Sequence, residues 1–181
     1  MTEPVQIHDV DKGWKALEKF LAQQPPAGAF VKIGVLGPAA TATHIPPKRE
    51  SSKTREMSYW ARRVSMGSPP TVVEIASFHE FGRGVPERSF IRNTVDAKAS
   101  DYKAHIRYLA DQMLAKITGQ MSAKKSLEII GQLVQSNILT AIESGIPPEL
   151  SEKTIKRKGS SRPLDDTGQL KSSITYATEG V

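Results

Sequence analysis

"VVEIASFHEFG", residues 72–82, is an apolar run that ends in a His-Glu pair. The segment 83–96, "RGVPERSFIRNTVD", follows at once and contains three arginines, a glycine and a proline. Because "TVVEIASF" (71–78) is rich in β-branched and aromatic residues, it predicts a strand. His79 and Glu80 are then either a catalytic pair at the mouth of a pocket or polar residues that stabilise the end of a strand.

The spacing around His79 and Glu80 favours the structural interpretation. A helical His-Glu-x-x-His metal site would need a second histidine where this chain has Arg83. On a strand, adjacent side chains point to opposite faces, so the pair would not share one substrate. We expect Glu80 to pair with Arg83, Arg88 or Arg92, and His79 to form a local hydrogen bond. We therefore predict no catalytic residue, no cofactor and no metal site.

Two further segments have the composition of strands. "AFVKIGVLG" predicts a strand over 29–36 before a Gly-Pro break, and the alternation near the C-terminus predicts another over 173–178. The strands at 29–36 and 71–78 are expected to pair antiparallel, with the residues between them forming an extended hairpin loop.

Two helices are predicted between these strands, over 96–117 and 122–143. Apolar residues recur there at steps of three and four, which is typical of helices with one buried face. The first stripe is Val95, Ala99, Tyr102, Ile106, Leu109, Met113 and Ile117, and the second is Leu127, Ile130, Val134, Ile138 and Ala141. We expect both stripes to pack in the core, with contact to a neighbouring subunit as the alternative. The predicted fold class is therefore α+β, a small antiparallel sheet packed against two long helices, with an extended loop or arm between the first two strands.

The chain length suits one domain. It has 181 residues, which we assign to a single domain with 37–70 as a long loop or arm and 145–181 as a C-terminal tail carrying a short strand. A short opening helix is expected before Pro25-Pro26. Net charge is +6, and the absence of cysteine excludes disulfides and thiolate metal sites. No segment has the length and apolarity of a membrane span, and the N-terminus lacks the pattern of a secretory signal, so we expect a cytoplasmic protein with no membrane partner.

Two stretches resemble motifs of tailed-bacteriophage virion morphogenesis proteins, the tail-completion or neck group. One is "VVEIASFHEFG" followed by "VPERSFIRNTVD", and the other is "IPPELSEKTIKRKGSSRPLDDTGQLKSSITY" (146–176). Both occur in the order of the family, with two helices between them. The resemblance implies a small α+β structural protein of the virion that joins the head to the tail. It also implies a location in the neck or tail of the virion, reached after assembly in the host cytoplasm.

The resemblance assigns roles in assembly to the motif residues. It implies a homo-oligomeric ring, with six copies as the expected number, that contacts other neck and tail proteins and surrounds the DNA channel. Residues of the motifs would form the subunit interface or stabilise it: Glu80, Phe81, Gly82, Arg88, Phe90, Arg92, Thr167, Gly168 and Leu170.

The arm at 37–70 carries a net positive charge and too few apolar residues for a core of its own. In a ring, its basic residues are expected to face the DNA channel or an adjoining protein, with phosphate contacts that do not depend on base sequence. They are Lys48, Arg49, Lys53, Arg55, Arg62 and Arg63. Two other functions stay open: a basic nucleic-acid-binding accessory protein, and a small hydrolase that uses His79 and Glu80.

Overall fold

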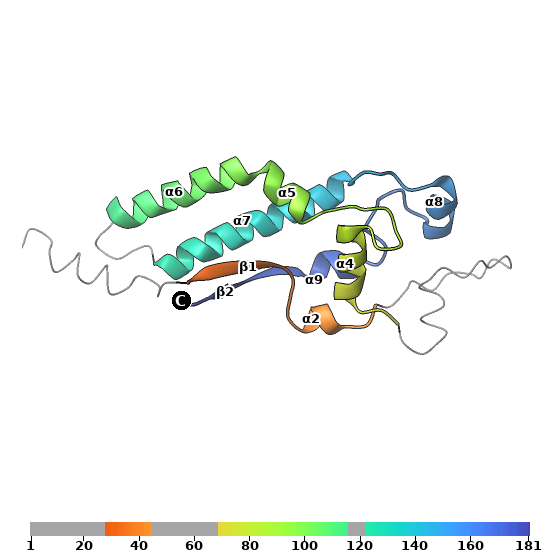
Figure 1. The fold of residues 1–181 in the computed structure, drawn as a ribbon, viewed down its shortest axis with the longest axis horizontal. Helices are drawn as coiled ribbons and strands as arrows, with labels where there is room; N and C mark the ends of the chain where they lie inside the picture. The colour runs from red at the N-terminus through yellow and green to blue at the C-terminus, as the bar shows by residue number, and fades with distance from the viewer. Residues whose placement is uncertain (1–27, 45–68, 116–121) are drawn as a thin grey trace, which may run out of the picture.

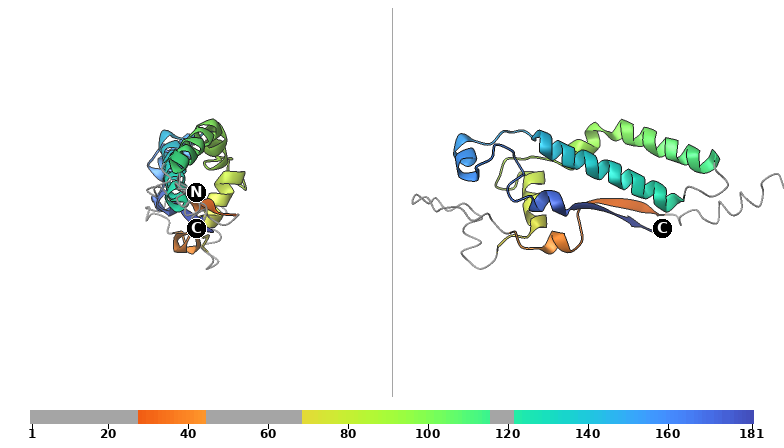
Figure 2. Two further views of the ribbon diagram at one scale, coloured as in Figure 1. Left: turned by 90° about the vertical axis from the view of Figure 1, so that its left-hand side faces the viewer. Right: turned by 180° about the vertical axis from the view of Figure 1, so that it is seen from behind.

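The computed structural model describes residues 28–44, 69–115 and 122–181. The elements of these residues, in chain order, are β1 (Phe30–Val35), α2 (Pro38–Thr41), α4 (Val72–Phe81), α5 (Arg92–Ala97), α6 (Ala99–Ala115), α7 (Ala123–Ser144), α8 (Glu152–Lys158), α9 (Gln169–Ser173) and β2 (Ile174–Glu179). Helices α6 and α7 run lengthwise beside each other, the two strands lie along α7, and α4 lies near one end of the strands (Figures 1 and 2). The fold class is α+β, as predicted.

Helix α7 is the centre of the core. Its N-cap Ser122 accepts a hydrogen bond from the backbone of Lys125. Its buried apolar residues repeat every four positions at Ile130, Val134, Ile138 and Ile142, so one face is continuously apolar. The predicted helix over 122–143 is confirmed, and most of its predicted stripe does pack in the core.

The sheet consists of the first and last elements of the described chain. β1 and β2 pair antiparallel, with Ile33 opposite Tyr176. α7 packs against both strands. Gly131 of α7 permits this approach, because a Cβ there would lie 2.4 Å from Cδ2 of Tyr176. The predicted strands over 29–36 and 173–178 are confirmed.

The predicted strand over 71–78 is wrong, because these residues begin helix α4. Thr71 and Glu74 form a capping box, in which the Thr71 hydroxyl accepts from the Glu74 amide and the Glu74 carboxylate accepts from the Thr71 amide. Gly82 ends the helix in the left-handed conformation with φ of 66°. The predicted pairing of 29–36 with 71–78 is also wrong, since β1 pairs with β2. Within the described residues, an isolated bridge joins Thr43, inside the predicted loop, to Thr71 at the start of α4.

The predicted helix over 96–117 is divided into α5 and α6 at Lys98, whose φ and ψ of −109° and 12° are not helical. α6 contacts α7 through the buried side chains of Tyr102 and Leu109. The Tyr102 hydroxyl also accepts a hydrogen bond from the Asn137 amide at 3.1 Å. Ile106, which the predicted stripe placed in the core, is 53% exposed.

The C-terminal residues from 145 onward carry the predicted short strand as β2, preceded by α8 and α9. Leu170, Ser173 and Ile174 are buried. Leu170 and Ile174 belong to the same apolar core as α7. Among the described residues, no helix combines the length and apolarity that a membrane crossing requires. The predicted opening helix and most of the predicted arm lie outside the described residues.

Candidate interaction site around Glu80 and Phe81

The Glu80 carboxylate is buried and fully engaged in hydrogen bonds. Its Oε1 accepts from the Ser89 hydroxyl at 2.7 Å, the Arg92 amide at 3.0 Å and the Arg92 Nε at 3.2 Å. Its Oε2 accepts from the Ile91 amide at 3.0 Å. Glu80 thereby joins the last turn of α4 to the start of α5, and places a negative charge beside the amides that open α5.

Of the three arginines proposed as partners of Glu80, Arg92 forms the ion pair, with its Nε 3.2 Å from Oε1 of Glu80. Its guanidinium also donates to the Glu80 carbonyl at 2.7 Å and to the exposed Glu87 carboxylate at 2.9 Å. Arg92 therefore completes the connection between α4 and α5 while half of its side chain remains exposed.

Arg88 takes a different role from the one proposed for it. It is buried, and its Nε and one terminal nitrogen donate to the carbonyls of Pro148 and Glu149 at 2.9 and 3.3 Å. Burial lowers the pKa of this guanidinium. Arg88 therefore ties the loop before α5 to the loop after α7. Phe90, two residues further on, is completely buried.

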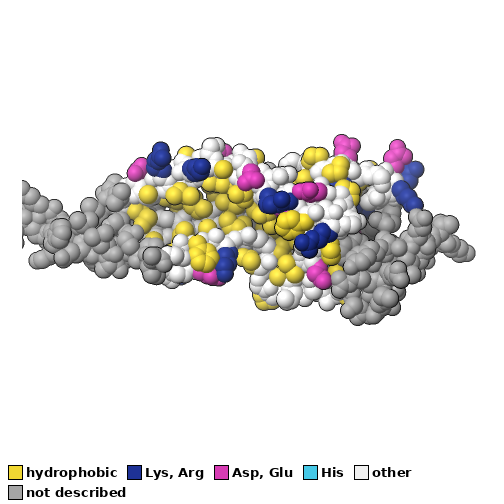
Figure 3. Space-filling view, viewed as in Figure 1, with side chains coloured by type: hydrophobic (Ala, Val, Ile, Leu, Met, Phe, Trp, Pro, Cys, Tyr) yellow, Lys and Arg dark blue, Asp and Glu magenta, His cyan; other side chains and the backbone are white. Residues whose placement is uncertain are grey.

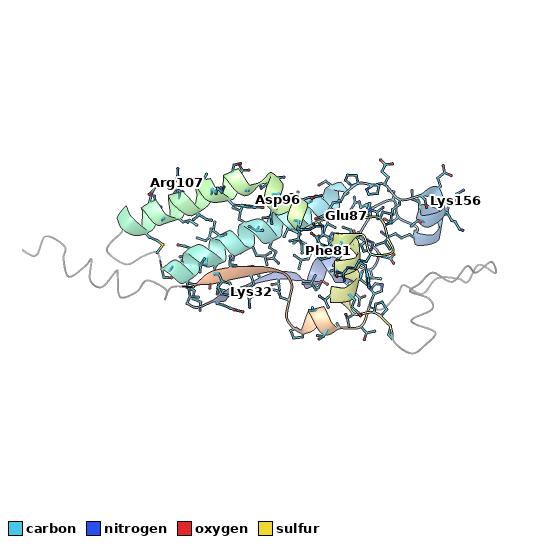
Figure 4. The ribbon with its side chains drawn as sticks, viewed as in Figure 1. Lys32, Phe81, Glu87, Asp96, Arg107 and Lys156 are labelled. Atoms are coloured by element: carbon cyan, nitrogen blue, oxygen red, sulfur yellow. The ribbon has the colours of Figure 1, made fainter. Side chains whose placement is uncertain are left out.

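Phe81 remains on the surface, 52% exposed, next to this buried arrangement. The guanidinium carbons of Arg92 and Arg83 lie 4.9 and 5.5 Å from the centroid of its ring, within the range of cation–π contacts. Figure 4 shows Phe81 and Glu87 near each other, well away from Arg107 on α6. The buried hydrogen bonds around Glu80 thus hold an aromatic side chain in an exposed position between two cations.

An open apolar groove lies beside Phe81. It has a volume of about 280 Å³ and is lined mainly by α4, the end of β1 and the residues around Phe90. Val73, 40% exposed, and Ser77 precede Phe81 at steps of four, so the three share one face of α4. Figure 3 shows apolar side chains interspersed with basic ones on this side of the molecule. The sequence analysis missed this groove because it predicts a strand here. On a strand, every second side chain lies on the same face, so Val73 and Ser77 would not form a separate surface with Phe81.

His79 lies outside the hydrogen-bond arrangement of Glu80. Its Nδ1 is buried without a partner among the described residues, so the expected local hydrogen bond is not formed by this atom. Burial and the nearby charges of Arg88 and Lys158 lower the pKa of His79 to about 4. His79 is therefore neutral near pH 7. Within the described residues, no group of three or more histidine and acidic side chains could hold a metal ion.

No family model, curated protein or solved structure matches this chain. The phage family inferred from the two motifs therefore remains a prediction.

The fold does bring the two motifs together. α9, which contains Leu170 of the second motif, packs against α4 of the first motif. Gly168, with φ of 73°, begins α9, and the Thr167 hydroxyl accepts from the Gln169 amide at 3.4 Å. Leu170 is buried in the shared core. Leu170 is thus a core residue of the fold, whereas the basic residues proposed for the DNA channel, at 48–63, lie outside the described residues.

Proposed function

We propose that this protein is a structural component of the neck or tail end of a tailed phage. It forms a homo-oligomeric ring that completes the tail or joins it to the head and surrounds the DNA channel. The proposal is supported by the resemblance of the two motifs to virion morphogenesis proteins and by the packing of those motifs against each other through α4 and α9.

The observation that carries the proposal is the contrast between Glu80 and Phe81. The carboxylate that would serve a catalytic role makes four structural hydrogen bonds. The next side chain is held on the surface at the edge of an apolar groove. Full burial of such an aromatic side chain contributes about 1.5–3 kcal/mol, so Phe81 is suited to contact a neighbouring subunit.

A rigid attachment of Phe81 fits the geometry of a ring. Ring subunits meet head to tail, through two different surfaces, and the ring closes only at one rotation between neighbours. Glu80 and Arg92 connect α4 to α5 through buried or half-buried groups, which limits the movement of Phe81 relative to the core.

The mass of the assembled protein tests this function. We expect mass photometry of the full chain to show particles several times heavier than 19.8 kDa, and electron microscopy of these particles to show closed rings. Phe81→Ala should reduce the assembled fraction at least tenfold. Phe30→Ala is the matched control, because Phe30 is also exposed and near a cation, Lys32, but lies on β1 outside the groove.

The proposal would be contradicted if the protein stayed monomeric at the highest concentration reached, both alone and mixed with phage neck and tail proteins. The net charge of +6 gives a competing function, a nucleic-acid-binding accessory protein. A monomer that binds double-stranded DNA with an affinity that falls steeply with salt would support that competitor.

A further inference from the structure

Helix α6 is the least covered long helix in the described part of the chain. Between Ala99 and Met113, only Tyr102 and Leu109 are buried. Tyr108 is 59% exposed, which is the largest exposed fraction among the large apolar side chains of the described residues. A helix that is attached to its own subunit by so few side chains leaves most of its surface available to another molecule.

One face of α6 combines an aromatic ring with two acidic groups. Asp101, Ala104, Tyr108 and Asp111 follow one another at steps of three, four and three, so they form one stripe on the helix. All four are exposed. Neither Asp101 nor Asp111 forms an ion pair with any other described residue. We call these four residues the acidic face of α6.

The groove at α4 has the complementary composition. Its exposed apolar residues are Val73 and Phe81, and the guanidinium groups of Arg83 and Arg92 lie over the Phe81 ring. Arg92 is already paired with Glu80 and Glu87, whereas Arg83 forms no ion pair within the described ranges. The groove therefore presents an aromatic ring beside an uncompensated positive charge, and the acidic face presents an aromatic ring between two uncompensated negative charges.

These two surfaces lie in different parts of one molecule. α6 runs away from α4 toward the other end of the described structure (Figures 1 and 2). If the groove of one copy binds the acidic face of the next, each bound pair still has one free groove and one free acidic face. Such a contact adds copies in one direction, which is the type of contact from which rings are built.

We propose that the α4 groove of one copy binds the acidic face of α6 of a second copy. The inference rests on the proposed function, because it specifies how the ring subunits meet. Tyr108 would contact Phe81 and Val73, and Asp111, one turn further along α6, would lie near Arg83. Asp101, about 15 Å from Asp111 along the helix, would add negative charge farther along the same face. Complementary charges at such a contact increase the rate of association and select the correct register.

Cysteine cross-linking tests this contact directly, since the natural chain contains no cysteine. The double variant Ser77→Cys/Ala104→Cys places one thiol in the groove and one on the acidic face. Treated with a short bismaleimide, it should give a ladder of covalent dimers, trimers and larger species. Ser77→Cys/Ala110→Cys is the matched control, because Ala110 is exposed on the same helix but is rotated by about 120° from Ala104.

Charge reversal gives a second, independent measurement. Arg83→Glu should weaken assembly at least tenfold in mass photometry, and adding Asp101→Arg and Asp111→Arg should restore most of it. The control is Asp96→Arg, at an exposed site on α5. Combined with Arg83→Glu in place of the two α6 substitutions, it should restore no assembly. Circular dichroism of each variant checks that it is folded.

The possible results separate the two proposals. If the unmodified chain does not assemble, either alone or mixed with phage neck and tail proteins, the proposed function is contradicted and the α4–α6 contact with it. If it assembles into rings but the Ala104 and Ala110 variants cross-link equally, or the charge reversals have no effect, the ring stands and the α4–α6 contact is wrong. Cross-linking to an added tail protein in place of a second copy would also overturn the contact.

Discussion

The buried carboxylate of Glu80 accepts a hydrogen bond from the Ser89 hydroxyl at 2.7 Å. The two side chains lie nine residues apart in the chain, on either side of the turn that leaves α4. Both side chains are within 5% of complete burial, so their hydrogen bond is shielded from bulk solvent. The turn between α4 and α5 is therefore built around a charged group rather than around an apolar cluster alone.

Removing the Glu80 carboxylate should destabilise the fold strongly. Glu80→Ala leaves the Ser89 hydroxyl and the amides of Ile91 and Arg92 without their acceptor. At about 1–3 kcal/mol for each unsatisfied buried group, partly relieved by water, we expect a loss of about 3–5 kcal/mol in the free energy of unfolding measured with urea. Glu87→Ala is the control, because its exposed ion pair should contribute at most about 1 kcal/mol. Equal losses in both variants would contradict the structural role of Glu80.

Two of the phenylalanines of the first motif, Phe81 and Phe90, should have different effects on stability and on assembly. Phe90→Ala removes a completely buried ring and should lower the free energy of unfolding by about 3–5 kcal/mol. Phe81→Ala removes an exposed ring with two cation contacts and should lower it by about 1 kcal/mol or less. In Phe81→Ala, the assembled fraction should fall at concentrations where the monomer is fully folded. A Phe81→Ala variant that unfolds like Phe90→Ala would show that Phe81 belongs to the core.

Because Gly131 packs against the Tyr176 ring, we expect Gly131→Ala to destabilise the fold. In an ordinary helix, Gly→Ala stabilises by about 1 kcal/mol. At Gly131 the new Cβ would lie 2.4 Å from the Tyr176 ring, so we expect a net loss of about 1–3 kcal/mol. In a Tyr176→Ala background the clash is absent, and the same substitution should become neutral or stabilising. Thermal unfolding of the four chains forms a double-mutant cycle, and simple additivity would contradict the contact.

The low pKa of His79 makes stability fall as the pH decreases. Above pH 6.5, His79 is neutral in both the folded and the unfolded chain, so it contributes no pH dependence. Between pH 6.5 and about 4, the unfolded chain binds a proton that the folded chain does not, which favours unfolding. This pKa difference corresponds to a loss of roughly 3 kcal/mol over that window.

His79→Gln should remove this part of the pH dependence while retaining the contribution of the carboxylates. The measurement is urea unfolding at several pH values between 4 and 8, with His105→Gln as the control, since His105 is exposed. If both variants follow the pH profile of the natural chain, His79 is accessible to protons in the folded protein.

The elements predicted correctly have local patterns that agree with their tertiary surroundings. In α7, apolar residues at steps of three and four produce a buried face wherever the helix packs, and Gly145 marks its end. In β1, the β-branched residues are followed by a Gly-Pro pair, and the strand ends before it.

The predicted strand over 71–78 is wrong because the helix end signals outweigh the strand preference of the β-branched residues. Thr71 and Glu74 have the spacing of a capping box, and Gly82 has the position of a helix-ending glycine. Both signals are present in the sequence. The intrinsic free-energy preference of β-branched residues for a strand is small. The two capping hydrogen bonds and the burial of Val72 and Ala76 stabilise the helix by more than this preference.

The sequence by itself determined the α+β class, the central helix, the two strands and the charged motif that surrounds Glu80. Only the tertiary structure decided that β1 pairs with β2, as in the Lys32–Glu179 ion pair between residues 147 positions apart. It also decided that Arg92 rather than Arg88 pairs with Glu80, and that Phe81 stays exposed while Phe90 is buried. The physical reason is that periodicity and capping act within a few turns of chain, whereas strand partners, ion pairs and exposure depend on which distant surfaces pack against α7.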